Sequence, residues 1–448
     1  MTKTIKTALY GQSVTVPNPD DDTHSIRSDS RGVNNMLADA VTSANVSRCE
    51  QSESDISESG SVAVYTAVSD ARDPEQCARE LTEQLNLADL GWVLFFCSAQ
   101  QDIDQISERL QQAFPDQIIM GCSTAGEITP LGYMQGSVCA VGFSREGFTI
   151  ETALIEEMDS FDFSAAQQLM SNMMQRCQLN QKAPVKGNTF VLALLDGMSE
   201  HEEIVLNTLN AAFGSIPLLG GSAGDDLDFA QTRVSYKGRC YQNAAVLMLI
   251  NTDYPFMVFS QKHVEETDEI LVVTDVDSEH RCVKELNAEP AAEAYARAVG
   301  VPVDQLSPAL FACHTLSVRI AGEGFVRAVR RVNDDGSLSF YCAVERGIVL
   351  RKNHHLDIAD GLETLLDQIE AQLGEQQLIL GFDCIFRLLE LKEKKQLQEV
   401  SELLSGYPLI GFHTYGEHVN GIHLNATFTG IAIGNKSFKP ASGSTFYQ

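Results

Sequence analysis

Three short loops in this 448-residue chain carry the residues best suited to chemistry. Each follows the same order of an apolar strand, a glycine, a polar stretch, a second glycine and an acid. They occupy residues 117–128, 216–227 and 407–419 and read QIIMGCSTAGEI, IPLLGGSAGDDL and YPLIGFHTYGEHV. Ligands collect at the carboxyl ends of strands in α/β sheets, so the loops predict binding positions at corresponding strand ends.

The residue types suggest what these loops could hold. Gly121 and Gly126 allow the backbone to approach a ligand closely, and the amides between them could hold a carboxylate or another small polar group. Glu127, Asp225 and Glu417 could bind an ammonium or guanidinium group. The alternative is structural, with the glycines forming tight turns and each acid accepting hydrogen bonds within its own turn. The spacing does not fit a phosphate-binding GxxxxGK[ST] loop.

The candidate ligand-binding residues lie in these loops and in the segment after the third one. They are Gly121, Cys122, Ser123, Thr124, Gly126, Glu127, Gly221, Ser222, Gly224, Asp225, Tyr415, Gly416, Glu417 and Asn425. Catalysis by Cys122 or Ser123, as in a hydrolase or transferase, is an alternative of a different class. However, Ser123 is not in a GxSxG motif, and a cysteine beside a strand end usually packs in the core. The sequence therefore favours a binding protein that is not an enzyme.

Repeated units of strand, helix, strand, loop and strand must position the loops. From the first strand to the loop glycine, the three units run from Val93 to Gly121, Phe190 to Gly220 and Leu378 to Gly411, a separation of 28, 30 and 33 positions. Right-handed crossovers would make the first two strands of each unit parallel neighbours. The strand after each loop is expected to return as an antiparallel partner.

Other segments give more local predictions. Ser199 and Glu202 resemble a helix capping box, and residues 391–404 predict one helix in the third unit. Residues 310–318 form a strand-like apolar run. The Asn333–Gly336 segment predicts a hairpin turn between two alternating strands. An amphipathic helix is expected at residues 359–373, with its leucines and Ile369 facing inward.

The pattern predicts an α/β fold in which two domains are built from these repeated units around mixed sheets. Residues 1–60 are rich in Ser, Asp and Glu and predict a disordered tail. An amino-terminal domain is expected over residues 61–285. A carboxyl-terminal domain follows over residues 286–448, opening with an alanine-rich helix near Pro290.

Composition limits the partners and the compartment. The net charge is −29, from 61 acidic and 32 basic residues, which argues against nucleic acid and against an anionic membrane surface. The longest apolar runs have strand length, and the amino terminus lacks the apolar region of a secretion signal. The eleven cysteines form no CxxC pair and lie mostly in apolar runs, so reduced core cysteines in a cytoplasmic protein are expected.

Histidines are the remaining residues with chemical potential. His314 lies within the apolar run LFACHTLSV, where a buried imidazole needs a partner. His413 and His423 lie in or after the third loop and could be ligands or hydrogen-bonded core residues. His354 and His355 lie in a polar stretch and are expected to be solvated.

Five segments of the chain together resemble the FIST family of bacterial sensory proteins. In the order of that family they read GCSTAGEI, LLDGMSEHEE with PLLGGSAGDD, PAAEAYARAVG, VRAVRRVNDDGSLSFYCAVERG and GFHTYGEHVNGIHLNATFTGIAIG. The resemblance covers about residues 62–434, including both the FIST N and FIST C domains. It implies a cytoplasmic signal-transduction module that binds a small molecule, such as an amino acid, and works with a histidine kinase or a cyclic-di-GMP signalling protein.

A chain with both domains and no kinase or cyclase motif further resembles the NosP group of this family. That resemblance implies a haem-based nitric oxide sensor that regulates a partner histidine kinase in a two-component system. Haem needs an apolar slot and an axial ligand, usually histidine. His314 stands where the family has a His-Pro-Leu-like segment, although Thr315 replaces the proline here. His314 is therefore the expected axial ligand, with His423 and His413 as alternatives, and a FIST sensor without haem is the alternative function.

Overall fold

The computed structural model describes residues 62–320 and 322–436. The predicted tail at residues 1–60 lies outside the described residues. Within the described part, every helix is too short or too polar to cross a membrane.

Three six-stranded sheets and one eight-stranded sheet form the fold. The first has the order β1 (Val64–Ser69), β6 (Val138–Ser144), β2 (Leu90–Ser98), β3 (Ile118–Thr124), β10 (Val234–Tyr236) and β11 (Arg239–Tyr241). The second has the order β25 (Ile422–Leu424), β24 (Gly416–Val419), β9 (Leu218–Ser222), β8 (Thr189–Leu195), β12 (Ala245–Thr252) and β7 (Phe148–Ile155). The third has the order β13 (Phe256–Lys262), β26 (Thr427–Gly434), β22 (Gln376–Cys384), β23 (Leu409–Thr414), β4 (Glu127–Thr129) and β5 (Gly132–Met134).

The fourth sheet lies between the second and third repeated units in the sequence. Its order is β18 (Glu323–Arg327), β17 (Leu316–Ile320), β21 (Val349–His355), β14 (Val264–Asp277), β15 (Cys282–Leu286), β20 (Leu338–Phe340) and β19 (Val329–Val332), with β16 (Glu289–Pro290) also paired to β15. The helices are α2 (Pro74–Gln84), α3 (Ile103–Ala113), α4 (Phe163–Asn180), α5 (Glu202–Phe213), α6 (Ala291–Val299), α7 (Pro308–Cys313), α8 (Ile358–Leu373), α9 (Ile385–Glu393) and α10 (Leu397–Leu404). The predicted α/β fold with mixed sheets is confirmed.

The three repeated units have the predicted strand arrangement. Strands β2 and β3, β8 and β9, and β22 and β23 are parallel neighbours. The long strand after each loop, β6, β12 or β26, pairs antiparallel with the first strand of its own unit. The helical segment between the two parallel strands is the crossover that parallel pairing requires.

The short hairpin that follows each loop joins the sheet of a different unit. Hairpin β4–β5 follows β3 but pairs with β23, β10–β11 follows β9 but pairs with β3, and β24–β25 follows β23 but pairs with β9. The exchange closes a cycle among the three units. It also carries strands across the predicted domain boundary near residue 286, because the second and third sheets contain strands from both sides of it.

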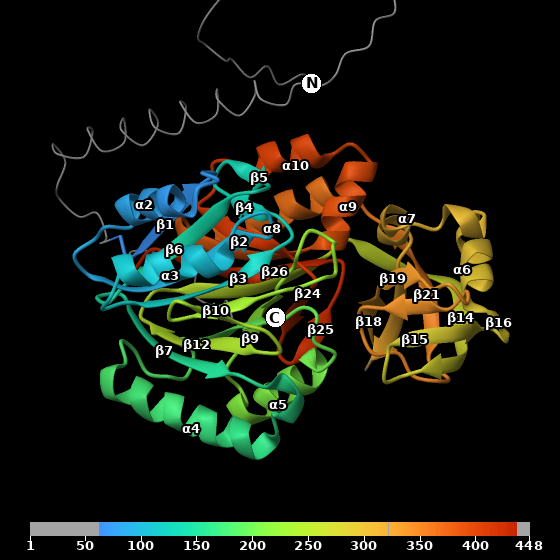
Figure 1. Ribbon diagram of the computed structural model, residues 1–448, viewed down its shortest axis with the longest axis horizontal. Coiled ribbons are helices and arrows are strands. Elements are labelled where there is room, and N and C mark those ends of the chain that lie inside the picture. Colours follow the sequence, from blue (N-terminus) through green and yellow to red (C-terminus); the bar gives the residue numbers. More distant parts are fainter. Residues whose placement is uncertain (1–61, 321, 437–448) are drawn as a thin grey trace, which may run out of the picture. The chain divides into compact units, whose positions relative to one another are not determined.

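Apolar side chains from the first three sheets meet in one central core. Phe96 of β2, Phe382 of β22 and Phe412 of β23 are in mutual ring contact, with centroids 4.8 to 6.4 Å apart. Helices α2 and α3 cover the first sheet, α4 and α5 cover the second, and α8 and α10 cover the third through three separate apolar clusters. Figure 1 shows α4 and α5 along the β7 and β12 side of the molecule. The fourth sheet has its own core with α6, α7 and α9.

Two of the local predictions are confirmed. The Asn333–Gly336 turn joins the antiparallel strands β19 and β20. Helix α8 matches the expected amphipathic helix, and its Leu362, Leu365, Leu366, Ile369 and Leu373 are buried.

Three other local predictions are wrong. The single helix expected at residues 391–404 is two helices, α9 and α10, separated at Lys395, whose φ of 58° is incompatible with a continuous helix. The strand-like run at residues 310–318 is split between α7 and β17, because Ser307 caps α7 and Pro308 occupies its first turn. Ser199 and Glu202 form no capping box, since the Glu202 carboxylate instead accepts a hydrogen bond from Ser222 Oγ at 2.6 Å.

Candidate functional site

The three glycine loops meet at one point, where they are linked by backbone hydrogen bonds. The strand exchange described above brings the carboxyl ends of β3, β9 and β23 together. Each loop donates at least one amide hydrogen to a carbonyl of another loop, and three of these bonds run from Ala125 N to His413 O at 3.1 Å, Gly224 N to Ser123 O at 3.1 Å, and Tyr415 N to Ser222 O at 3.2 Å. The three bonds form a closed ring that involves every repeated unit.

Close packing explains the glycine in the second loop. A Cβ atom added to Gly224 would lie 2.9 Å from both the Cβ and the amide nitrogen of Ala125. Such a distance is shorter than normal carbon contacts, so only glycine allows the backbones to approach this closely. The amides of this ring are thus engaged by protein carbonyls.

Glu127 and Glu417 occupy equivalent positions in the first and third loops. Each carboxylate accepts a hydrogen bond from the threonine three residues before it, Thr124 or Thr414. The other oxygen of Glu127 accepts from Ser137 N and Oγ at 3.1 and 2.7 Å, and that of Glu417 accepts from the backbone and hydroxyl of Thr427 at 3.3 and 2.8 Å. Both side chains are buried and tie a loop to the start of its returning strand.

Asp225 is not the counterpart of these two acids. In strand register Glu127 lies opposite Phe412 and Glu417 opposite Gly221, whereas the corresponding residue of the second unit is Val234, opposite Cys122. The chain between Asp225 and β10 is an inserted loop. The Asp225 carboxylate accepts hydrogen bonds from the backbone of Phe229, Ala230 and Gln231 and from the Tyr415 hydroxyl.

Protonation of Glu127 and Glu417 predicts a pH dependence of stability. Burial raises the pKa of Glu127 to about 7 and that of Glu417 to about 8, although the hydroxyl donors oppose the shift. Between pH 6.5 and 8 the folded protein therefore binds more protons than the unfolded chain, and its stability should fall as the pH rises. In the Glu127→Gln, Glu417→Gln double variant we expect the fall in the free energy of unfolding over this pH range to be smaller by about 1 kcal/mol or more. Urea unfolding at several pH values measures it.

An exposed acid provides the control for this experiment. Glu146→Gln removes one carboxylate from the surface and should leave the slope of stability against pH unchanged. A double variant with the same slope as the unmodified protein would show that neither buried carboxyl gains a proton in this range.

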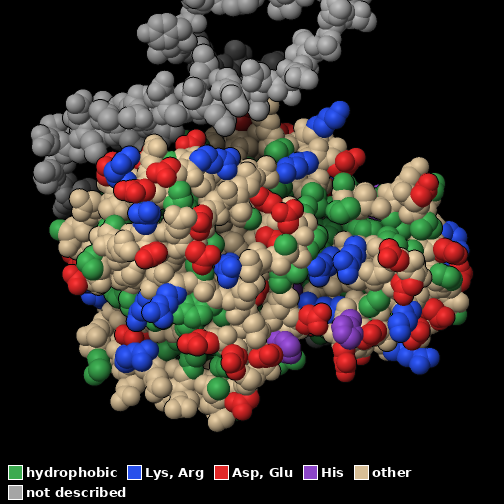
Figure 2. Space-filling view, viewed as in Figure 1, with side chains coloured by type: hydrophobic (Ala, Val, Ile, Leu, Met, Phe, Trp, Pro, Cys, Tyr) green, Lys and Arg blue, Asp and Glu red, His purple; other side chains and the backbone are tan. Residues whose placement is uncertain are grey.

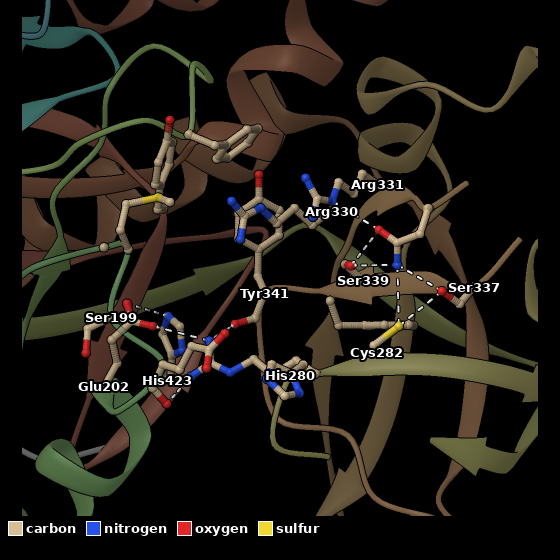
Figure 3. Close-up of a pocket in the computed structure, with 18 of the residues that line it drawn as sticks. Ser199, Glu202, His280, Cys282, Arg330, Arg331, Ser337, Ser339, Tyr341 and His423 are labelled. Atoms are coloured by element: carbon tan, nitrogen blue, oxygen red, sulfur yellow. Dashed lines mark hydrogen bonds and ion pairs between the residues drawn. The ribbon is translucent and has the colours of Figure 1, made fainter. Parts of the chain in front are cut away.

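A cavity of about 490 Å³ lies beside the third loop. Its walls come from the second unit, the fourth sheet and the third unit, and include Phe229 and Tyr415. Figure 3 shows Arg330, Tyr341 and His423 among the residues that line it. The volume falls within the range of small-molecule sites. Acidic and basic side chains both line the cavity, so its chemistry suits a polar ligand.

Three arginines line the cavity, and the guanidinium of Arg330 is the one that forms no hydrogen bond to another described residue. Its guanidinium carbon lies 4.5 Å from the ring centroid of Phe229 and 6.0 Å from that of Tyr341. Among the described residues it forms no ion pair, and its Nε has no hydrogen-bond partner. A guanidinium whose faces contact aromatic rings and whose N–H groups are free can bind a carboxylate through two parallel hydrogen bonds.

The aromatic residues around Arg330 are fixed by one another and by the third loop. Phe229 lies 5.2 Å from Tyr415 and 5.9 Å from Tyr341, measured between ring centroids. The Tyr415 hydroxyl donates to Asp225 and accepts from Leu227 N at 2.8 Å. The inserted loop after Asp225 is therefore held against the cavity, and with it the ring beneath Arg330.

Arg281, which also lines the cavity, is already paired. It donates to the Glu200 carbonyl at 2.9 Å and to the Tyr341 carbonyl, and its guanidinium lies 3.4 Å from the Glu202 carboxylate. Glu202 in turn accepts from Ser222 of the second loop. Arg281 thus holds the wall together. Arg331, the third arginine of the cavity, donates from Nε to Asn333 Oδ1 at 3.1 Å, so Arg330 is the arginine of the lining whose guanidinium forms no hydrogen bond to another described residue.

The sequence-derived candidates divide between this cavity and the packed loops. Tyr415 and His423 line the cavity. Asn425 is buried next to it, where its side-chain oxygen accepts from the Cys342 thiol at 2.9 Å. The first-loop residues Gly121, Cys122, Ser123, Thr124 and Gly126, together with Gly221 and Gly416, lie within the strands and junctions described above.

Cys122 and Ser123 have surroundings that do not suit nucleophiles. The Cys122 thiol is in the central core, and burial raises its pKa well above the usual value. Ser123 Oγ accepts a hydrogen bond from Arg233 N at 3.0 Å and is 4% exposed. Neither residue has the activated character that covalent catalysis requires.

The three histidines predicted as candidate axial ligands of haem lie in three different environments. His314 ends helix α7 and is half-buried, and it is not among the residues that line the cavity. His413 is buried against Tyr133, with ring centroids 4.7 Å apart. His423 does line the cavity, but seven Asp, Glu and Arg side chains line it as well. Because haem needs an apolar slot, the residues of this cavity do not fit it.

Sequence reasoning missed the central residues of the cavity and misplaced one histidine. Arg330 and Tyr341 lie in the arginine-rich hairpin segment, whose three arginines could have indicated an anion-binding position. Phe229 lies in the insertion after Asp225, where the sequence has no feature that indicates a binding residue. His355 was expected to be solvated but its side chain is 6% exposed, and its Nδ1 lies 2.8 Å from the Glu390 carboxylate.

Comparison with known proteins gives two domain matches. The model described as the FIST N domain matches residues 91–289, and that described as the FIST C domain matches residues 291–420. A protein of Methanocaldococcus jannaschii named "Uncharacterized protein MJ1623" is 22% identical over 403 residues, which is 80% of this chain and 77% of that protein. A crystal structure of cyanuric acid hydrolase from A. caulinodans aligns with 42% of this chain and 71% of its own at 9% identity, with a TM-score of 0.25, a likeness too weak to support any statement about this chain.

Proposed function

This chain belongs to the FIST family, and we propose that it is a sensor whose cavity binds a small ligand with a carboxylate group, such as an amino acid. FIST domains are signal-transduction sensor domains. The observation that carries the ligand class is Arg330, an aromatic-stacked guanidinium without an ion-pair partner among the described residues.

The other cavity residues favour a ligand with charges of both signs. Glu200, Asp334 and Asp335 line the same cavity as Arg330. An amino acid could place its carboxylate on Arg330 and its ammonium toward these acids, and both contacts would be charge-assisted hydrogen bonds. On the face in Figure 2 basic and acidic side chains are interspersed, which does not favour a polyanion such as nucleic acid as the ligand.

A ligand screen tests this proposal. The full-length protein is heated with each of the common amino acids and with simple dicarboxylates at millimolar concentration, and its melting temperature is recorded. A ligand at about 100 times its Kd stabilises the folded protein by about 2.7 kcal/mol, so at least one compound is expected to raise the melting temperature by several degrees. If none does so, and calorimetry detects no binding, the carboxylate proposal fails.

The rival is the haem-based nitric oxide sensor that the NosP resemblance implies. It rests on that resemblance and on the three candidate axial histidines, of which His423 lies in the wall of the cavity. The purified protein is incubated with haem and its visible spectrum measured before and after adding nitric oxide. A Soret band that shifts with nitric oxide and disappears in His423→Gln, or in His314→Ala or His413→Ala, would favour the rival over the carboxylate proposal.

We further propose that a cytoplasmic partner protein, a histidine kinase or a cyclic-di-GMP signalling protein, responds to the ligand state. The ligand can regulate this partner only if the bound and free sensors differ in their affinity for it. Kinase autophosphorylation measured with free and ligand-bound sensor should therefore give two different rates. Equal rates would exclude regulation of that kinase.

A further inference from the structure

Three side chains of metal-ligating type converge next to the cavity. Glu203 comes from α5, Cys342 from the segment between β20 and β21, and His423 from β25. His423 Nδ1 lies 4.0 Å from Cys342 Sγ and 3.9 Å from Glu203 Oε1. All three ligand atoms lie within 4.8 Å of one another.

His423 lacks good hydrogen bonds although it is buried. Its side chain is 1% exposed, and among the described residues its Nε2 has no hydrogen-bond partner and the only hydrogen-bond partner of Nδ1 is the Cys342 sulfur at 4.0 Å. A buried polar group without partners is costly, and native structures seldom leave one unexplained. A ligand on Nδ1 would account for this histidine.

We propose that Glu203, Cys342 and His423 bind a zinc ion. Zinc takes thiolate, imidazole and carboxylate ligands at about 2.0 to 2.3 Å, which places neighbouring ligand atoms of a tetrahedral site about 3.3 to 3.6 Å apart. The two separations of 3.9 and 4.0 Å are only slightly longer. A sulfur ligand selects zinc over magnesium or calcium, which prefer oxygen.

The surroundings also suit a metal. Glu202 Oε1 lies 4.0 Å from the opposite ring nitrogen, Nε2, of His423, where an outer carboxylate commonly orients a metal-bound histidine. Ala343 N donates to Glu203 Oε1 at 3.2 Å and holds that carboxylate in place. When zinc binds, the Cys342 thiol must release its proton to solvent. Three protein ligands leave a fourth position for water or another small ligand.

The second histidine cluster, His263, His355 and Glu390, has a different character. Arg387 donates to His263 Nδ1 at 3.2 Å, and Thr315 N donates to His355 Nε2 at 3.3 Å. Each ring must therefore carry its proton on the nitrogen that faces Glu390. These nitrogens donate hydrogen bonds to the carboxylate at 2.7 and 2.8 Å and have no lone pair to offer a metal.

Cobalt substitution tests the zinc proposal in the full-length protein. The protein is treated with a chelator, dialysed and titrated with Co²⁺, whose thiolate complexes absorb in the near ultraviolet. We expect one Co²⁺ per chain with a thiolate charge-transfer band that Zn²⁺ displaces. Cys342→Ser should abolish the band, and His423→Gln and Glu203→Gln should each weaken Co²⁺ binding at least tenfold.

Matched variants separate this site from other thiols and histidines. Cys384→Ser removes a fully buried thiol elsewhere, and His355→Gln alters the second histidine cluster, so both should retain the band. Arg330→Gln should retain it too, which makes failure of the zinc site distinguishable from failure of the carboxylate proposal. A missing band in the unmodified protein, or a band that survives Cys342→Ser, would overturn the proposal. Circular dichroism verifies folding, and the partly exposed Glu203→Gln provides a test if Cys342→Ser does not fold.

Discussion

Replacing Arg330 with glutamine should weaken binding of the carboxylate ligand by about 10- to 100-fold. Hydrogen bonds to charged groups contribute about 1.5 to 3 kcal/mol, and each 1.4 kcal/mol changes an equilibrium constant tenfold. The variant loses the positive charge and the paired N–H groups while keeping part of the stem that packs on Phe229. The measurement is calorimetric titration with the compound that gives the largest shift in the thermal screen.

Two further variants show whether the affinity for the ligand depends on the planar geometry of the Arg330 guanidinium or on its charge alone. Arg330→Lys keeps the charge but lacks the planar fork, so it should restore only part of the affinity. Arg346→Gln removes an exposed arginine that does not line the cavity and should bind like the unmodified protein. Unchanged affinity in Arg330→Gln would remove the basis for the carboxylate proposal.

The repeated units were predictable because their signals are local. Apolar runs and helical periodicity recur at near-constant separations, and the crossover rule then fixes the parallel pairing of β2 with β3, β8 with β9 and β22 with β23. The antiparallel return of β6, β12 and β26 follows from the same order. The buried face of α8 follows from the spacing of its leucines.

The hairpin exchange could not be predicted in the same way. Strands β4, β5, β10, β11 and β25 have three residues each, and β24 has four. Segments this short have no periodicity that identifies a partner, and the first strand of each hairpin, β4, β10 or β24, pairs with a strand of another unit. A sequence pattern within one unit contains no information about which other unit its hairpin will join. The same limitation concealed the ring of hydrogen bonds among the loops.

The candidate site was only partly visible for a related reason. The similar loop sequences suggested equal roles for Glu127, Asp225 and Glu417. The insertion after Asp225 shifts the sequence of the second unit relative to its strand register, so that Val234 occupies the equivalent position. That insertion also brings Phe229 to Arg330. His355 appeared solvated because its sequence neighbours are polar, whereas its burial depends on Glu390 of α9.

A buried ionic network joins α9 to the third sheet and should dominate local stability. Arg387 is fully buried, and its Nε donates to Asp383 Oδ1 at 2.6 Å. Its NH1 donates to Gln261 Oε1 at 3.0 Å and to His263 Nδ1 at 3.2 Å. The other oxygen of Asp383 accepts from the Tyr133 hydroxyl at 2.8 Å. Removing either charge would leave the opposite one buried without its counterion.

Arg387→Met should therefore lower the free energy of unfolding by about 3 to 5 kcal/mol, because Asp383 stays buried and unpaired. Asp383→Asn should be similarly destabilising. The double variant should lose less than the sum of the two single losses, since neither charge then remains without its partner. Urea unfolding at neutral pH measures all three values.

The pair of Arg176 with Glu151 at 2.7 Å supplies the control, because solvent reaches both side chains, which are 51% and 19% exposed. Arg176→Met should cost only about 0 to 1 kcal/mol, since solvent screens a surface pair. Strictly additive losses in the Arg387 and Asp383 variants would show that the two charges do not depend on each other. A loss in Arg387→Met no larger than that in Arg176→Met would mean that water reaches Asp383 and compensates its charge, contrary to the burial of both side chains.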